Sequence, residues 1–246
     1  MIVIRFFLRF LKWVVILFFS TSILAVIAYR FLPVYITPLM IIRCCQQIAD
    51  GDAPTLHHSW KPLDEISPHL PVAVMAREDQ RFLLHHGFDT ESIQKAIEYN
   101  KTHSHRRGAS TISQQTAKNV FLWPNSNFVR KGFEAYFTVL MELFWSKHRI
   151  MEVYLNSIEM GPGIYGAQAV AEQHFNTNAE DLSRNDCALI AATLTNPLHY
   201  SSKDPSPYVR KIQGILLREM RYIPSFPKEG ESYDPNTVSG GVYKNK

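Results

Sequence analysis

The chain is poor in cysteine, and this scarcity excludes several kinds of site. Its 246 residues contain Cys44, Cys45 and Cys187, an odd number that supplies no disulfide framework. Two of the three are adjacent, and no Cys-x-x-Cys pair is present. The ten histidines include the pair in "HSH" at 103–105, but no further ligands follow at the spacing of a zinc site. We therefore expect no metal or redox centre, and three small buried side chains.

Charge of one sign is also in short supply. The 26 lysines and arginines are nearly balanced by 22 acidic residues, which leaves a net charge of +4. Nucleic-acid-binding domains need denser clusters of lysine and arginine, so we expect no nucleic-acid partner. A mild positive excess suits a protein that works beside an anionic membrane or on phosphorylated substrates.

Alternating strand patterns are scarce too, whereas apolar residues recur at helical spacing from residue 72 onward. The sequence therefore predicts a mainly α domain. We expect a helix at 128–145, capped by Ser126 or Asn127. Further helices are expected at 72–83, from 111 onward, and at 147–156, 166–174, 181–194 and 207–221.

One long apolar run does occur, at residues 13–29, and it carries no charge. Its length, extended by flanking apolar residues, is typical of a membrane-spanning helix. Three cations precede the run and one follows closely, so the N-terminus is expected in the cytoplasm and the remainder outside. A cleaved signal peptide is the alternative, because "VIA" before Tyr29 is a tolerable cleavage site. The apolar stretch at 31–42 favours a retained anchor.

Composition divides the chain into four segments. Prolines break the second segment into short pieces, and the last is rich in Pro, Gly, Ser and Asn with little periodicity, so we expect it to be loosely ordered. The segments are an N-terminus with anchor at 1–30, a linker and domain entry at 31–71, the main helical domain at 72–222 and a tail at 223–246.

Two adjacent carboxylates stand out in "EDQRFLLHHG" at 78–87. On a helix continuing from residue 72, Asp79 falls within the apolar stripe and Glu78 at its edge. A buried aspartate needs a partner, such as His86 or a distant base, so a structural role is favoured for Asp79. Glu78, beside an aromatic ring, is placed to act as a general base. A solvated glutamate is the alternative, and local spacing alone favours it.

A polar helix start follows in "GASTISQQTAKN" at 108–119. Thr111 and Gln114 have the spacing of a capping box, so a helix begins here. Its free N–H groups can bind anions. Thr111, Gln115 and Lys118 share one face, which makes a plausible phosphate and sugar site. An exposed polar face explains the same spacing.

A third segment, "RKGFE", places Arg130 and Glu134 one helical turn apart with Lys131 beside them. A surface ion pair worth a few tenths of a kcal/mol is one interpretation. The other is a group of two cations and a second carboxylate that faces Glu78 across a cleft. Spacing does not choose between them.

Together these segments resemble the bacterial peptidoglycan glycosyltransferases, the polymerase module also found in class A penicillin-binding proteins. The family patterns E-D-x-x-F-x-x-H-x-G, G-x-S-T-I-x-Q-Q-x-x-K-N and R-K-x-x-E are all met, in order, and "KHRIMEVYLN" and "GPGIYGAQAVAEQHF" match the segments that follow. The resemblance covers roughly residues 70–200. The chain departs from the family in "HFNTNAEDL", where an aromatic–Phe–Gly–Lys run is usual, and in Asp186, where Glu is usual.

The resemblance implies a lysozyme-like helical head, a smaller membrane-associated jaw and one N-terminal transmembrane helix, without a transpeptidase domain. It implies that lipid II is polymerised into β-1,4 glycan strands, with inversion and release of undecaprenyl pyrophosphate. Glu78 would be the general base, and Glu134 would orient the cations or support the leaving side. Lys118, Arg130 and Lys131 would meet the pyrophosphate. The implied substrate-binding residues are Asp79, Phe82, His85, Ser110, Thr111, Gln115, Lys118, Asn119, Arg130 and Lys131.

The resemblance also sets expectations for cofactors, partners and place. No cofactor is required, although a divalent cation could assist at the pyrophosphate. The expected partners are lipid II, the growing lipid-linked glycan, membrane lipids and cell-wall synthesis or division proteins, with the catalytic domain in the periplasm of an inner-membrane protein. Phe121, Leu122, Trp123 and Phe128 suit a membrane interface, or the edge of the core. The alternative functions are a lysozyme-like lytic enzyme and a non-catalytic lipid II-binding scaffold.

Overall fold

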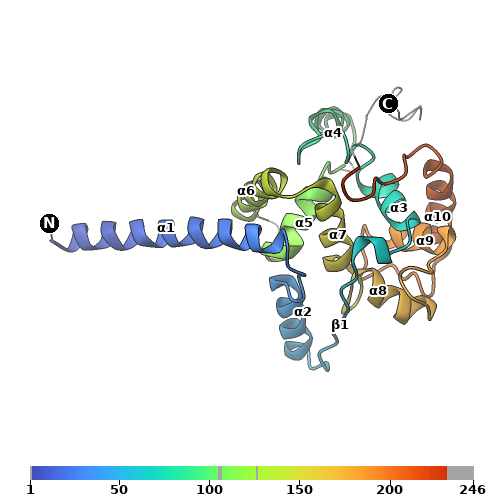
Figure 1. Cartoon of the computed structure of the whole chain (residues 1–246), viewed down its shortest axis with the longest axis horizontal. Coiled ribbons are helices and arrows are strands. Elements are labelled where there is room, and N and C mark those ends of the chain that lie inside the picture. The colour runs from blue at the N-terminus through green and yellow to red at the C-terminus, as the bar shows by residue number, and fades with distance from the viewer. Residues whose placement is uncertain (1, 105–106, 126, 232–246) are drawn as a thin grey trace.

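The N-terminal helix α1, Ile2–Tyr29, projects far from the rest of the chain (Figure 1). The computed structural model describes residues 2–104, 107–125 and 127–231. Within these ranges, Val3–Tyr29 is the one helix long and apolar enough to cross a membrane. Anchors and signal sequences both satisfy that test of length and composition.

The rest of the described chain is mainly helical, as the sequence predicts. The larger helices are α2 (Pro38–Ala49), α3 (His69–Glu78), α4 (Thr90–Thr102), α5 (Ile112–Phe121), α6 (Phe128–Phe144), α7 (Lys147–Ser157), α9 (Arg184–Thr193) and α10 (Pro207–Glu219). The shorter ones are η1 (Leu63–Glu65), α8 (Gly166–Val170) and the π-helical turn η2 (Ala171–Phe175). Three short strands, β1 (His57–His58), β2 (Glu159–Gly161) and β3 (Ile164–Tyr165), form a sheet of order β1-β3-β2. β1 pairs parallel to β3, and β2 antiparallel.

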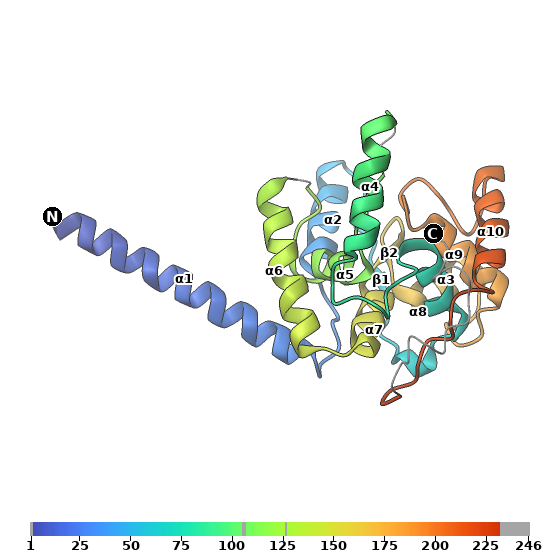
Figure 2. The same cartoon turned by 90° about the horizontal axis from the view of Figure 1, so that it is seen from above.

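The core forms where α5 packs against α6 and α7, and where α3 and α10 pack against α9. Large apolar side chains fill it without exposure to solvent, among them Ile112, Met141, Ile150 and Met151. Helix α4 contributes no buried side chain and stands away from this body (Figure 2). Helices α6, α7 and α2 pack against α5, and the residues of its first turn are buried.

Side-chain caps set several helix starts where the sequence predicts them. Thr111 and Gln114 form both hydrogen bonds of a capping box at the start of α5. Asn127 caps α6, whereas Ser126, the alternative, lies outside the described residues. At α9, Ser183 and Asp186 form a second capping box, so an aspartate can serve where the family usually has glutamate.

The expected helix at 72–83 is wrong at its C-terminal end. α3 stops at Glu78, and Asp79 leaves the helical conformation with φ −159° and ψ 79°. Residues 80–84 form turns instead. Phe82 fits the apolar periodicity because its side chain is fully buried. The chain reaches it through the non-helical turns that follow α3, and not by continuing the helix.

Two of the larger helices were not expected. α2 lies in the proline-broken segment, where Pro38 occupies the first turn and so starts a helix instead of ending one. α4 begins at Asp89, whose side chain accepts the N–H of Ser92. The position of α2 also corrects the cysteine prediction. Cys187 is buried, but Cys44 is half-buried and Cys45 exposed.

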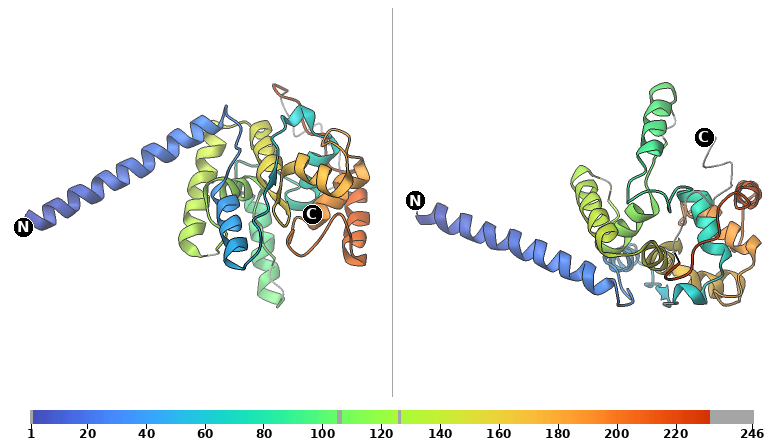
Figure 3. Two further views of the ribbon diagram at one scale, coloured as in Figure 1. Left: turned by 90° about the horizontal axis from the view of Figure 1, so that it is seen from below. Right: turned by 45° about the horizontal axis from the view of Figure 1, so that its top comes forward.

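The last turns of α1 pack against the helical domain (Figure 3). Ser22 Oγ lies 2.8 Å from the Tyr136 hydroxyl on α6, and Trp145 Nε1 donates to the carbonyl of Val26 at 2.7 Å. Arg149 on α7 donates to the carbonyls of Tyr29, at 2.8 Å, and Leu32, at 2.5 Å. The end of α1 is therefore a packed part of the domain.

The residues expected at a membrane interface divide between two environments. Phe128 is 99% exposed, as an interface residue should be before it meets lipid. Leu122 is buried in the core, and Phe121 and Trp123 are half-buried against it. At the other end of the chain, Ile223 is buried and the ring of Phe226 stacks 6.3 Å from that of Phe82. Residues 232–246 of the tail lie outside the described part.

Candidate active site

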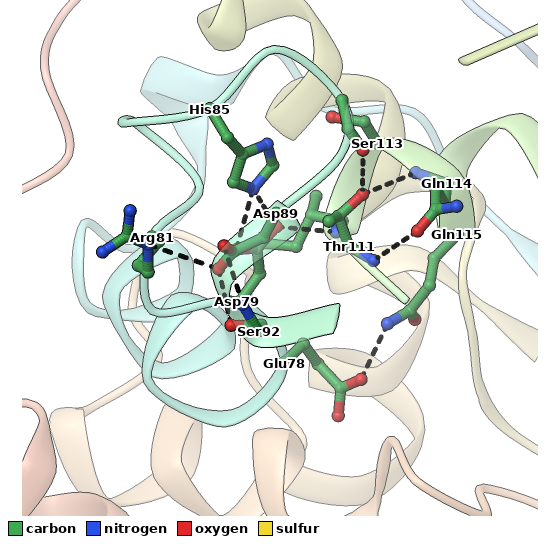
Figure 4. A network of polar contacts seen from close by, with 12 residues as sticks. Glu78, Asp79, Arg81, His85, Asp89, Ser92, Thr111, Ser113, Gln114 and Gln115 are labelled. Carbon is green, nitrogen blue, oxygen red and sulfur yellow. Dashed lines mark hydrogen bonds and ion pairs between the residues drawn. The ribbon is translucent and has the colours of Figure 1, made fainter. Parts of the chain in front are cut away.

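The end of α3 turns the two adjacent carboxylates in opposite directions (Figure 4). Glu78 is the last helical residue, and its carboxylate points toward Gln115 of α5. Asp79 leaves the helix and points toward His85 and the start of α5. The repulsion expected between neighbouring acids is thus avoided because each faces different partners.

Asp79 is buried and tied to two elements. Its carboxylate accepts the Ile112 N–H, at the N-terminus of α5, at 3.0 Å, and both its oxygens lie 3.0 Å from His85 Nε2. A buried carboxylate is tolerated when it is paired and hydrogen-bonded in this way. The expected partner His86 is exposed, so that prediction is wrong, since the chain reaches His85 through a turn. Asp79 therefore holds the end of α3 against the start of α5.

Glu78 is placed differently, on the wall of a cavity that forms part of the groove described below. Its side chain is 16% exposed, and Oε2 accepts a hydrogen bond of 2.8 Å from Gln115 Nε2. Oε1 lies 3.9 Å from Arg77 Nε, and a terminal nitrogen of Arg77 donates to Thr195 Oγ1 at 2.5 Å. The fully solvated glutamate of the alternative interpretation is therefore wrong.

Phe82 and His85 lie behind this carboxylate and do not line the groove. The Phe82 ring is fully buried, 6.3 Å from the His85 ring and 4.5 Å from Lys147 Nζ. His85 is also buried and bonded to Asp79. These two residues, which the resemblance implies as substrate-binding, therefore lie in the packing beside Asp79 and not on the groove wall.

The first turn of α5 is anchored by Thr111, whose hydroxyl accepts the Gln114 N–H and donates to the carbonyl of Gly87 at 2.7 Å. Gly87 has φ +86°, and a Cβ there would lie 2.8 Å from Thr138 Cγ2, so only glycine fits. Thr111 is buried, which corrects the expectation of one polar face shared by Thr111, Gln115 and Lys118. Its hydroxyl is used inside the protein.

A charged cluster extends the site onto α6. Arg130 Nη1 bonds to Glu134 Oε2 at 2.6 Å, and Lys131 forms an ion pair with the other oxygen of the same carboxylate. Lys131 Nζ also lies 3.4 Å from Ser110 Oγ. The side chains of Arg130 and Glu134 are 9% and 4% exposed, so the surface-pair interpretation is wrong for them. Lys131 remains half-exposed.

Lys118 of α5 lies in the electrostatic field of both carboxylates. Burial lowers the pKa of Lys118, and nearby Arg130 and Lys131 act in the same direction, while Glu134 and Glu78 oppose the shift. The charges of Glu78, at the end of α3, and Glu134, on α6, therefore both act on this lysine. Lys118 therefore lies near enough to both Glu78 and Glu134 for their charges to affect it, which the spacing alone could not establish.

Two adjoining cavities run past Glu78 and Lys118, whereas Arg130, Lys131 and Glu134 line neither of them. The larger, of about 820 Å³, is lined by Glu78, Arg77 and Ser110, and by the edges of Asp79 and Thr111. The smaller, of about 230 Å³, holds Lys118 and Asn119. Gln115 and Thr195 line both cavities, so the two form one groove with Gln115 at the junction.

Several groove residues were missed from the sequence. Arg77 and Thr195 belong to the larger cavity, and Arg43 and Glu159 to the smaller. Glu159 is buried, which raises its pKa even though Arg43 lies at 3.5 Å. Arg43 gives no local signal because only the packing of α2 brings it here. Within the described residues, no group of three or more His, Cys, Asp or Glu side chains could hold a metal ion.

Comparison with known proteins gives a consistent result. A family model described as "Transglycosylase" matches residues 46–221. The chain is 62% identical over 220 residues to a biosynthetic peptidoglycan transglycosylase of Bacteroides thetaiotaomicron, with 89% of each chain covered. It is 49% identical over 224 residues to the protein of the same name from Bdellovibrio bacteriovorus, covering 90% of this chain and 89% of that one. A Caulobacter vibrioides relative is 53% identical over 189 residues, covering 77% and 80%.

Proposed function

The chain belongs to the transglycosylase family of peptidoglycan-building glycosyltransferases, and we propose that its substrate is lipid II. The donor is the growing glycan, linked through its terminal N-acetylmuramyl sugar to undecaprenyl pyrophosphate. The acceptor is lipid II, whose N-acetylglucosamine 4-hydroxyl attacks the anomeric carbon of the donor. Attack from the face opposite the leaving group inverts the α-linked donor to a β-1,4 bond, as in inverting hydrolases with a sugar hydroxyl replacing water.

Glu78 is the general base in this proposal. It takes the proton from the acceptor hydroxyl as the oxygen forms its bond to the anomeric carbon, and the electron pair of the broken bond leaves with the pyrophosphate. The hydrogen bond from Gln115 to Oε2 supports this role, since it holds the carboxylate at the wall of the larger cavity. Ser110, on the same wall, is placed to bind a sugar or phosphate oxygen.

Lys118, Arg130 and Lys131 stabilise the departing pyrophosphate. Fixed cations aimed at developing negative charge lower a barrier most where water is scarce, and Lys118 is largely buried. Glu134 orients the cations, which its two ion pairs support. Asn119 and Gln115 would contact the donor from the smaller cavity. With this positive charge supplied by side chains, we propose that no metal is required and that a divalent cation can assist at the phosphates.

We further propose that α1 is a retained anchor in the inner membrane, with the N-terminus in the cytoplasm and the catalytic domain in the periplasm. Cleavage before Tyr29 would remove Ser22 and Val26, which contact the domain. The jaw would be α2, α6 and the end of α1, where exposed apolar residues such as Phe128, Leu143 and Ile41 could enter the lipid.

The observation that carries the proposal is the meeting of Glu78, Gln115 and Lys118 at one junction in the groove. The test is to incubate the full chain in detergent with labelled lipid II, and separately with pre-made glycan strands. We expect polymer from the first and no shortening of the second. Shortened strands would favour the lytic alternative, and binding of lipid II without polymer would favour the scaffold.

A further inference from the structure

A fully buried phenol lies directly behind the proposed base. Tyr154 is on α7, within the "KHRIMEVYLN" segment, and its side chain is not exposed to solvent. Its hydroxyl donates to Gln115 Oε1 at 3.3 Å, while Gln115 Nε2 donates to Glu78 Oε2 at 2.8 Å. A chain of two hydrogen bonds therefore leads from the core to the groove.

This chain has a fixed direction while Glu78 is ionised. A carboxylate only accepts hydrogen bonds, so Gln115 must present its NH₂ group to Glu78 and its oxygen to Tyr154. The phenol must then be the donor. Burial, together with the charges of Glu78 and Asp79, raises the pKa of Tyr154 well above its ordinary value, which keeps the proton on the phenol.

We propose that Tyr154 is a positioning residue for the base of the glycosyl transfer. By holding the Gln115 amide in one orientation, Tyr154 keeps Oε2 of Glu78 engaged and leaves Oε1 to take the proton from the acceptor hydroxyl. Oε1 lies 3.9 Å from Arg77 Nε, beyond hydrogen-bond distance, which is consistent with its being the reactive oxygen. This inference rests on the proposed function of Glu78.

The direct test replaces only the hydroxyl, with Tyr154→Phe. The aromatic ring still fills the core, but the Gln115 amide is free to turn its oxygen toward Glu78. We expect the kcat for lipid II polymerisation to fall by about three- to tenfold, the range of one hydrogen bond, with little change in KM. Glu78 also loses a dependable N–H donor, so the acidic limb of the pH–rate profile should move to higher pH.

Two further variants separate positioning from general stability. Tyr136→Phe removes the hydroxyl of another tyrosine, which lies 2.8 Å from Ser22 Oγ and lines neither cavity, and should leave kcat and the pH profile unchanged. Gln115→Leu breaks the same chain on the groove side without touching the core, and should reproduce the pH shift. In the Gln115→Leu background, adding Tyr154→Phe should cause no further loss.

The outcomes distinguish this inference from the function beneath it. If wild type polymerises lipid II and Glu78→Gln does not, an unchanged rate and pH profile in Tyr154→Phe would overturn the positioning role alone. Additive losses in the double variant would also overturn it, because Tyr154 would then act other than through Gln115. If wild type makes no polymer, the proposed function fails and this inference fails with it.

Discussion

At the residue scale, the site depends on giving chemically similar side chains different surroundings. Glu78 and Asp79 are neighbours in sequence, yet one lines the groove and the other is buried between α3 and α5. Lys118 and Lys131 differ in the same way. The first is largely buried between two carboxylates, and the second is half-exposed beside Ser110. The surroundings of each side chain, more than its residue type, therefore determine what it can do in the site.

The buried position of Lys118 predicts a pH dependence. Because burial lowers its pKa from 10.5, Lys118 loses its charge at lower pH than an exposed lysine as the pH rises. We expect kcat to fall on the basic side, below pH 10.5, as this cation is lost. Lys118→Arg stays charged at higher pH, so its basic limb should move upward, although a different shape should lower its neutral-pH rate by about tenfold.

A series of lipid II polymerisation rates from about pH 6 to 10 makes this measurement. Lys101→Arg, an exposed substitution on α4, is the matched control and should leave the profile unchanged. Identical basic limbs in wild type and Lys118→Arg would show that another group sets the limb.

At the scale of elements, the segment "HFNTNAEDL", which departs from the family pattern, contains a turn whose backbone conformation explains its asparagine. The π-helical turn η2 is followed by Asn176, its C-cap, which has φ 52° and ψ 44°, the left-handed conformation. The family usually has glycine at this point of its aromatic–Phe–Gly–Lys run. Asparagine is among the few other residues that adopt this conformation readily, so the substitution preserves the turn. His174, beside it, is held by a 2.7 Å hydrogen bond to Ser202 Oγ.

Asn176 therefore gives a stability prediction. Asn176→Gly should be neutral or slightly stabilising, because glycine adopts positive φ without steric cost. Asn176→Val should lower the free energy of unfolding by about 1–2 kcal/mol, because a β-branched residue clashes there. Denaturant unfolding of the two variants checks this, and equal stabilities would contradict the conformational argument.

The limits of sequence reasoning also appear at this scale. Caps and apolar periodicity predict α5, α6, α7 and α10 because their determinants lie within a few residues. They miss the end of α3, because the N–H of Ile112, 33 residues later, draws Asp79 out of the helix. The Tyr154–Gln115 contact likewise spans 39 residues, so no local pattern could reveal it. The family resemblance drew attention to Glu78, Lys118 and Glu134, but neither it nor motif spacing indicated that Arg43, Arg77 and Thr195 line the groove.

At the scale of the whole molecule, Arg149 joins the end of α1 to the rest of the domain. Its guanidinium donates to the carbonyls of Tyr29, the last residue of α1, and Leu32. It also pairs with Glu152 and lies 5.1 Å from the Trp60 ring centre. Several partners share one charged group with 13% exposure, so its loss leaves carbonyls and a carboxylate unsatisfied. Arg149 therefore fixes how the end of α1 meets the domain.

Arg149→Leu should lower the Tm of the detergent-solubilised chain by about 5 °C, which corresponds to about 2 kcal/mol for a chain of this size. Arg149→Lys should recover part of the loss, since a lysine cannot reproduce the planar fork of donors. Arg221→Leu, at an exposed position, is the control and should melt near wild type. An unchanged Tm in Arg149→Leu would mean that the contacts of Arg149 with the end of α1 contribute little to the stability of the protein.

The central claim is that Glu78 removes a proton from the acceptor sugar, and the rate of the Glu78→Gln variant tests it most directly. Glutamine keeps the size of the side chain and removes its basicity. With labelled lipid II in detergent, we expect a fall of roughly 100-fold or more in the polymerisation rate, while Glu98→Gln, an exposed change on α4, keeps the wild-type rate. A Glu78→Gln enzyme that retains more than about a tenth of the wild-type rate would contradict the claim.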